Sequence, residues 1–337
     1  DGVVLAKQWR LKHTLRGHYD GVRSVAFSPS GKVLFSASED STVRMWNLSV
    51  GPPPKKGSAP DIEPVHTFRG HKRAVLSVAA GTHGDQDVIM TGGLDGTARI
   101  WPVPPHNTDM FSAYNPQYSF TVCHGHTDAV WDVRVWSRST LAATASADGT
   151  VGLWSYDTTP TLLRMLPAPR EGVRPTSVDF VADGAQVVVA YSDSSLVTYD
   201  VETGKQVVEL PSNETYDGTR ATQINRVVSH PTKSLAITAH EDKYIRCFDV
   251  ASGSIVSSFV AHRDSVHALA VNPSGTHFMT GGHDASIRGW DMNKFNCVQE
   301  FSSHRRKYAE AVNTLAFHET DNMLASGGAD AFIKVYQ

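Results

Sequence analysis

Residues 17–46 read GHYDGVRSVAFSPSGKVLFSASEDSTVRMW. Residues 22–27 alternate apolar and polar side chains, residues 28–31 are Ser-Pro-Ser-Gly, and residues 33–35 begin a second apolar run. Alternation with a period of two predicts a β-strand, and Pro and Gly between two such runs predict a turn. The stretch opens with a Gly-His pair and ends with Asp40 and Trp46, which are six residues apart.

The same landmarks return along the chain. In order, the His, Asp and aromatic residues are His18, Asp40 and Trp46; His71, Asp95 and Trp101; His126, Asp148 and Trp154; His262, Asp284 and Trp290; and His304, Asp330 and Tyr336. Two further units lack the His but keep Asp193 with Tyr199 and Asp242 with Phe248. The aromatic residues are 42 to 55 positions apart, a period that predicts one four-stranded blade per unit. We therefore expect an all-β, seven-bladed β-propeller.

The whole chain, 1–337, is expected to form this single domain. The blade boundaries lie near 16–68, 69–122, 123–166, 167–210, 220–260, 261–301, and 302–337 plus 9–15. Residues 333–336 give a third strand for the last blade, and no fourth strand follows. We expect the segment before the first Gly-His pair to complete that blade, which would hide an open sheet edge.

Composition excludes several classes of function. The chain has 40% hydrophobic residues, 19% charged residues and a net charge of −3, so it carries no basic field for nucleic acid. No apolar run is long enough to insert into a membrane, and no signal-peptide pattern opens the sequence. Three scattered cysteines fit a reducing compartment. We expect a cytoplasmic protein, with any membrane association made through partners.

The repeated His and Asp residues could suggest a hydrolase triad, but one set in every blade cannot converge on one site. We interpret them as scaffold, with each Asp accepting hydrogen bonds from the His ring or from nearby backbone N–H groups. The run Cys123-His124-Gly125-His126 has no second cysteine nearby, so we expect no metal site there. Phosphate-binding and nucleophile-elbow motifs are absent from the sequence. We expect neither catalysis nor a cofactor.

Longer loops are expected on both faces. Residues 49–64 and 102–119 follow third strands and should emerge on the bottom face, whereas residues 211–222 and 305–311 precede first strands and should emerge on the top face. Side chains expected at the mouth of the channel on the top face are Arg23, Leu76, Trp131, Thr176, Asn225, His267 and Asn313, joined by Glu39, Glu241 and His283.

The top face is the expected partner-binding surface, because Trp and Arg dominate interface energetics. We expect Trp131 beside the cations Arg23 and His267, with Arg174 one step outside them. Arg305 and Arg306 should rise on the same face, as should the insertion near Tyr216. Tolerated surface insertion is the alternative for each loop.

The Gly-His pair, the later Asp and the closing Trp290-Asp291 resemble the WD-repeat family. From Trp9 to Tyr336 the chain also resembles the striatin family. The stretches that carry this resemblance are 61–64 with Phe68, 125–131, 146–151, 223–232, 238–242, 282–288, 297–300, 304–307 and 328–331. Blade two, with residues 98–101, and the 102–120 insertion depart from it.

The resemblance implies a signalling scaffold. Striatins are regulatory subunits of protein phosphatase 2A that also assemble germinal-centre kinases, Mob-like proteins and other adaptors into phosphatase–kinase (STRIPAK) complexes. Their phosphatase-binding coiled coil and calmodulin-binding segment precede the propeller, so the resemblance implies a C-terminal fragment. A different WD-repeat adaptor, such as a substrate receptor of a ubiquitin ligase, remains the alternative.

Overall fold

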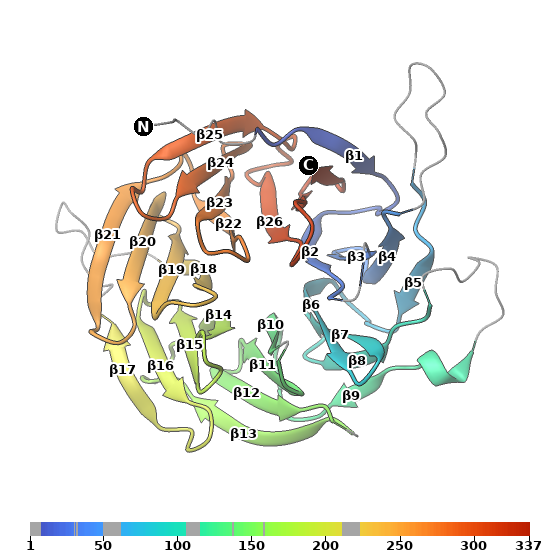
Figure 1. Ribbon diagram of the computed structural model, residues 1–337. Coiled ribbons are helices and arrows are strands. Elements are labelled where there is room, and N and C mark those ends of the chain that lie inside the picture. Colours follow the sequence, from blue (N-terminus) through green and yellow to red (C-terminus); the bar gives the residue numbers. More distant parts are fainter. Residues whose placement is uncertain are drawn as a thin grey trace.

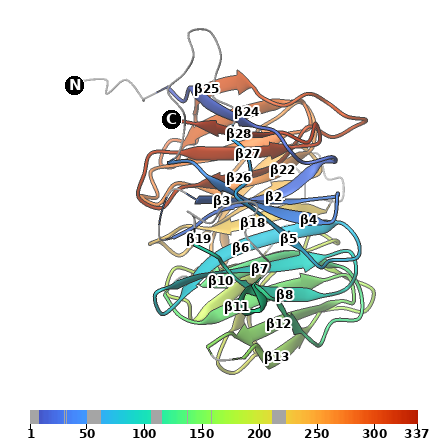
Figure 2. The same ribbon diagram turned by 90° about the vertical axis from the view of Figure 1, so that its right-hand side faces the viewer.

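The computed structural model describes residues 8–29, 31, 33–49, 62–105, 115–136, 138–157, 159–210 and 223–337. These residues form 28 strands and one short 3-10 helix, Pro116–Tyr118. The strands make seven four-stranded antiparallel sheets, arranged as blades around a ring (Figure 1). Figure 2 shows the same ring from its side. The predicted seven-bladed propeller is confirmed.

Each blade begins with the strand nearest the ring axis. From blade one to blade seven these innermost strands are β2 (Val22–Phe27), β6 (Val75–His83), β10 (Val130–Trp136), β14 (Pro175–Phe180), β18 (Ile224–Ser229), β22 (Val266–Val271) and β26 (Val312–Phe317). The second strands are β3 (Val33–Ser38), β7 (Gln86–Gly93), β11 (Leu141–Ser146), β15 (Gln186–Tyr191), β19 (Leu235–His240), β23 (His277–Gly282) and β27 (Leu324–Gly328).

The third and fourth strands form the outer half of each blade, and the fourth strand is the more exposed of the two. The third strands are β4 (Thr42–Asn47), β8 (Ala98–Pro102), β12 (Thr150–Ser155), β16 (Leu196–Asp200), β20 (Tyr244–Asp249), β24 (Ser286–Asp291) and β28 (Ile333–Tyr336). The outermost strands are β5 (His66–Arg69), β9 (Thr121–Cys123), β13 (Thr161–Pro167), β17 (Gln206–Leu210), β21 (Ser254–Val260), β25 (Cys297–Ser302) and β1 (Leu11–Leu15).

The N-terminal strand closes the ring, as predicted. β1 pairs antiparallel with β28, with Leu11 opposite Tyr336 and Leu15 opposite Ile333. Two backbone hydrogen bonds between Arg10 and Gln337, 3.1 and 2.9 Å long, extend the pairing. In Figure 1, β1 accordingly lies in the last blade, close to the C-terminal end of the chain. Blade seven thus has its fourth strand, and the edge of β28 is covered.

The hydrophobic core lies between neighbouring blades. Val133 and Val178 are fully buried and belong to two such interblade clusters. Polar side chains on the innermost strands tie the blades together: the Val133 N–H donates to Ser77 at 3.1 Å, and the Val178 N–H donates to Asp132 at 3.2 Å. Asp132 is fully buried and also pairs with Arg226 at 2.9 Å. Within the described residues, no helix is long and apolar enough to span a bilayer.

Candidate partner-binding face

The repeated His and Asp residues form one hydrogen-bonded chain in a blade. In blade three, His126 Nδ1 lies 2.9 Å from Asp148 and Nε2 lies 2.7 Å from Thr144 Oγ1. Trp154 Nε1 donates to the same Thr144 oxygen at 2.8 Å, and the Thr127 N–H donates to Asp148 at 3.0 Å. The indole, hydroxyl, imidazole and carboxylate therefore satisfy one another.

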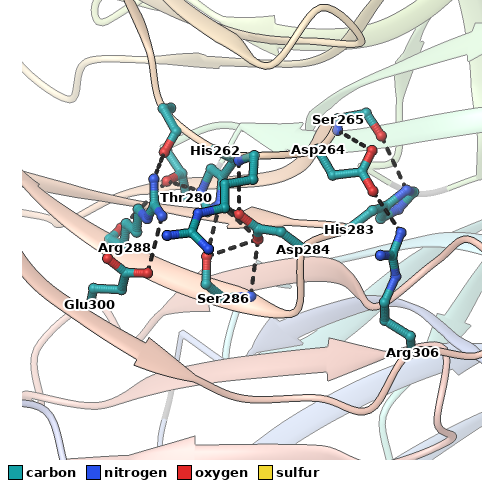
Figure 3. A network of polar contacts seen from close by, with 12 residues as sticks. His262, Asp264, Ser265, Thr280, His283, Asp284, Ser286, Arg288, Glu300 and Arg306 are labelled. Atoms are coloured by element: carbon teal, nitrogen blue, oxygen red, sulfur yellow. Dashed lines mark hydrogen bonds and ion pairs between the residues drawn. The ribbon is translucent and has the colours of Figure 1, made fainter.

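The arrangement recurs in the other blades that carry the His. Figure 3 shows it in blade six, where Asp284 and Thr280 bracket His262. Blades one and two repeat it with Ser36 and Thr91 as the central hydroxyls.

Blades seven and five depart from this His, hydroxyl and Trp arrangement. Blade seven keeps His304 between Asp330 and Ser326, but the hydroxyl of Tyr336 interacts with Ser303 instead. In blade five, His240 from β19 contacts Thr238 at 2.7 Å and so supplies an imidazole that the repeat pattern did not predict.

The histidine rings of these groups are buried, and the carboxylates stay ionised. The side chains of His18, His126, His262 and His304 are 0% exposed. Burial opposes ionisation of Asp95, but hydrogen bonds from Lys72 N–H, Thr97 and His71 outweigh it and lower its pKa to about 2. A histidine with both ring nitrogens occupied and no exposed surface cannot reach a substrate.

Cys123 is buried and its neighbourhood does not resemble a metal centre. Burial raises the pKa of its thiol to about 12, which disfavours the thiolate that a metal requires. Among the residues that the structure describes, no group of three or more His, Cys, Asp or Glu side chains is placed to hold a metal ion.

A β-bulge occurs near the start of every innermost strand. The register with the second strand shifts at Arg23, Leu76, Trp131, Thr176, Asn225, His267 and Asn313. These are the seven positions that the sequence analysis placed at the channel mouth. A residue in a β-bulge is not paired with the neighbouring strand, and its side chain is redirected. This explains why these seven positions form one set.

Several bulged side chains bond to the next blade. Thr176 donates to the carbonyl of Ile224 at 2.6 Å, Asn225 donates to that of Val266 at 3.0 Å, and Asn313 donates to that of Val22 at 3.1 Å. Trp131 differs, because 42% of its surface is exposed. It is the one member of the seven that presents a large apolar surface to solvent.

Arg23 is held between two carboxylates. Its Nε donates to Glu39 Oε1 at 2.7 Å, and Nη1 lies 2.9 Å from Glu310 Oε2. Burial disfavours the charged guanidinium, but Glu310 and Glu39 outweigh burial and raise the pKa of Arg23. Arg23 is a cation as expected, but its charge is neutralised within the top face.

His267 is not the cation that the sequence analysis expected. Its ring stacks on His283, with centroids 4.0 Å apart and planes 11° from parallel. Burial, the neighbouring His283 and the positive charge of Arg23 lower the pKa of His267 to about 3. His267 is therefore neutral at physiological pH.

The expected grouping of Trp131 with these two residues remains a prediction. Trp131 lies on blade three, with one blade between it and Arg23 on blade one, and two blades between it and His267 on blade six. Arg174 is exposed at the start of blade four, next to Pro175 of β14. The insertion near Tyr216 lies outside the described residues.

Arg305 and Arg306 lie where blade seven begins. The Arg305 N–H donates to Asp330 at 2.9 Å, and Arg306 Nη2 lies 2.6 Å from Asp264 of blade six (Figure 3). Both residues are exposed. Arg306 therefore ties two blades together as well as facing solvent.

Tyr308 is 95% exposed, and the repeat pattern does not single it out. Residues 307–310, here called the Tyr308 turn, are closed by reciprocal backbone hydrogen bonds between Lys307 and Glu310, 2.9 and 3.1 Å long. Tyr308 has a φ of 56°, which is rare for a bulky residue. Lys307 pairs with Asp20 of blade one at 2.6 Å. The basic residues 305–307 indicate that this loop is at the surface. They do not predict that the side chain of Tyr308 is exposed.

Comparison with known proteins places this geometry in a family. The WD domain, G-beta repeat family matches residues 9–47, 62–102, 116–155, 253–291 and 295–337, which together make up more than half of the chain. The chain belongs to the WD-repeat family. The matched segments of this WD-repeat protein contain the hydrogen-bonded His, Asp and Trp residues of blades one, two, three and six.

The expected resemblance to striatins is confirmed. The WD-repeat chain is 42% identical to human Striatin-3 over 98% of its own length and 41% of that protein. It is 41% identical to mouse Striatin over 99% of its length and 43% of that protein, and 42% identical to human Striatin-4 over 98% and 43%. The chain thus spans about two fifths of the length of these relatives.

Proposed function

We propose that the chain is a non-catalytic protein-interaction scaffold that binds its partners through the top face. The observation that carries the proposal is the contrast between two sets of residues. The recurring His and Asp side chains are buried and fully engaged, whereas Trp131, Tyr308 and Tyr19 are exposed by 42%, 95% and 88% on the face where the innermost strands begin. Exposed aromatic side chains on rigid elements are typical anchors of protein interfaces.

By its resemblance to striatins, we further propose that the protein acts in a complex with protein phosphatase 2A. Kinases of the germinal-centre type, Mob-like proteins and other adaptors are the partners we expect, and calmodulin would bind a segment outside this chain. The proposed location is the cytoplasm. The relatives named above give no support to a ubiquitin-ligase receptor.

Affinity purification of the tagged full-length protein, followed by mass spectrometry, tests this proposal. We expect phosphatase and kinase subunits at near-stoichiometric amounts. Recovery of ubiquitin-ligase subunits without phosphatase or kinase would overturn it.

A further inference from the structure

A pocket of about 370 Å³ lies between blades six and seven, on the bottom face where the innermost strands end. Its apolar lining includes Trp9, Phe317, Met279 and Val298. They come from the segment before β1, from β26, from β23 and from β25, so the pocket exists only in the closed ring. Val298 is 40% exposed, which leaves part of that apolar surface open to solvent.

Contacts within the chain hold the pocket wall in place. The side-chain amide of Gln299 bonds to both backbone groups of Trp9, accepting from its N–H at 2.9 Å and donating to its carbonyl at 3.1 Å. The Trp9 ring packs edge-on against Phe317, with centroids 5.7 Å apart. A wall that is already ordered lowers the entropic cost of binding.

The charged residues lining the pocket are all acidic. They are Glu319 and Asp321, in the turn between β26 and β27, and no Lys or Arg is among the described residues that line the pocket. The turn itself is rigid, because His318 Nδ1 accepts the N–H groups of Thr320 and Asp321 at 3.2 and 2.9 Å. An apolar floor with a rigid carboxylate rim therefore faces the solvent.

We propose that this pocket is a second docking site, which binds a short protein segment carrying an apolar anchor flanked by Lys or Arg. The volume lies in the range of ordinary ligand sites, and an apolar anchor in a preformed pocket is how hot spots bind. The acidic rim complements flanking cations and disfavours flanking carboxylates. The site lies on the opposite face from Trp131, so it does not depend on the proposed top-face function.

Fluorescence anisotropy with two labelled peptides tests the proposal on the purified protein. The probes are GKKLFSLKKG and its acidic counterpart GEELFSLEEG. We expect the basic peptide to bind with a dissociation constant in the tens of micromolar and the acidic peptide to bind at least tenfold more weakly. Val298→Asp should weaken the basic peptide at least tenfold, and Glu319→Gln should weaken it several-fold at low salt.

Val256→Asp is the matched control, because it places the same charge on an exposed valine of another outer strand, β21. It should leave peptide binding unchanged, as should the top-face variant Trp131→Ala. Absence of binding by the basic peptide at millimolar concentration would overturn the proposal. Equal losses in Val298→Asp and Val256→Asp would do so as well, because the loss would then not depend on the pocket.

Discussion

Arg23 Nη1 lies 2.9 Å from Glu310 Oε2, which joins the innermost strand of blade one to the Tyr308 turn of blade seven. Lys307 makes a second link to blade one through Asp20, and Arg306 links the same loop to blade six through Asp264. These ion pairs are partly exposed, so each contributes little by itself. Together they hold a bulky residue at positive φ with its ring in solvent. Strain of this kind is typical of functional surfaces.

Tyr308→Asn separates function from stability. Asparagine tolerates positive φ better than tyrosine, so the variant should unfold at the same temperature as the wild type or a higher one. Loss of the exposed ring should nevertheless weaken partner binding about tenfold or more. Differential scanning calorimetry and a partner pull-down measure the two effects. A variant with lower melting temperature and unchanged binding would show that the ring packs within the protein.

Asp148→Ala tests the structural role of the repeated Asp. Removing this carboxylate leaves the His126 ring and the Thr127 N–H without their acceptor, at a cost of about 1–3 kcal/mol. Urea unfolding should show the loss, and Glu171→Ala, which removes an exposed carboxylate before β14, should show none. Wild-type stability combined with lost partner binding would instead make Asp148 a functional residue.

The same carboxylates should make stability depend on pH. The folded pKa of Asp95 is lowered to about 2, and hydrogen bonds from their His, Thr or Ser partners also lower the pKa of Asp148 and Asp284 despite burial. The unfolded value is about 3.9. Stability from these groups is therefore complete above about pH 5 and is lost as the pH falls towards 2.

Urea unfolding at several pH values between 7 and 2.5 measures this loss. Asp95→Asn should be less stable than the wild type at pH 7 but should have a shallower dependence on pH below 4. An identical pH dependence in both proteins would contradict the role assigned to Asp95.

The fold could be predicted because its determinants repeat. His, Asp and Trp recur once per blade, and the alternation in strands such as β2 is local. The bulge positions were found by the same alternation, although the register shift that re-aims Arg23 and Trp131 depends on pairing with the next strand. His240 could not be predicted, because it replaces the missing imidazole from another strand.

The properties of the binding face were less predictable. The neutral state of His267 arises from burial and from the charges of His283 and Arg23, which lie 16 positions or more away in sequence. The exposure of Tyr308 depends on ion pairs that reach two other blades. Sequence patterns report local periodicity, whereas these features come from contacts between blades.

Removing residues 1–15 tests ring closure. Deletion takes away β1 and leaves the backbone of β28 as an open edge, which invites pairing with other chains. We expect aggregation, or a large loss of stability in size-exclusion and thermal measurements. Leu15→Ala is a milder version, because Leu15 is fully buried and its truncation should cost about 2–5 kcal/mol. A monomeric deletion variant with unchanged melting temperature would contradict closure by β1.

The central claim is that partners bind through the exposed aromatic residues of the top face, and Trp131→Ala tests it most directly. Quantitative pull-down of the purified partner by the full-length protein should show at least 30-fold weaker binding, which corresponds to about 2 kcal/mol for a hot-spot aromatic residue. The melting temperature should change little, because Trp131 is 42% exposed. Arg305→Glu with Arg306→Glu should weaken binding less, mainly at low salt. Unchanged binding by Trp131→Ala, together with lost binding after deletion of residues 51–60 on the expected bottom-face loop, would contradict the account.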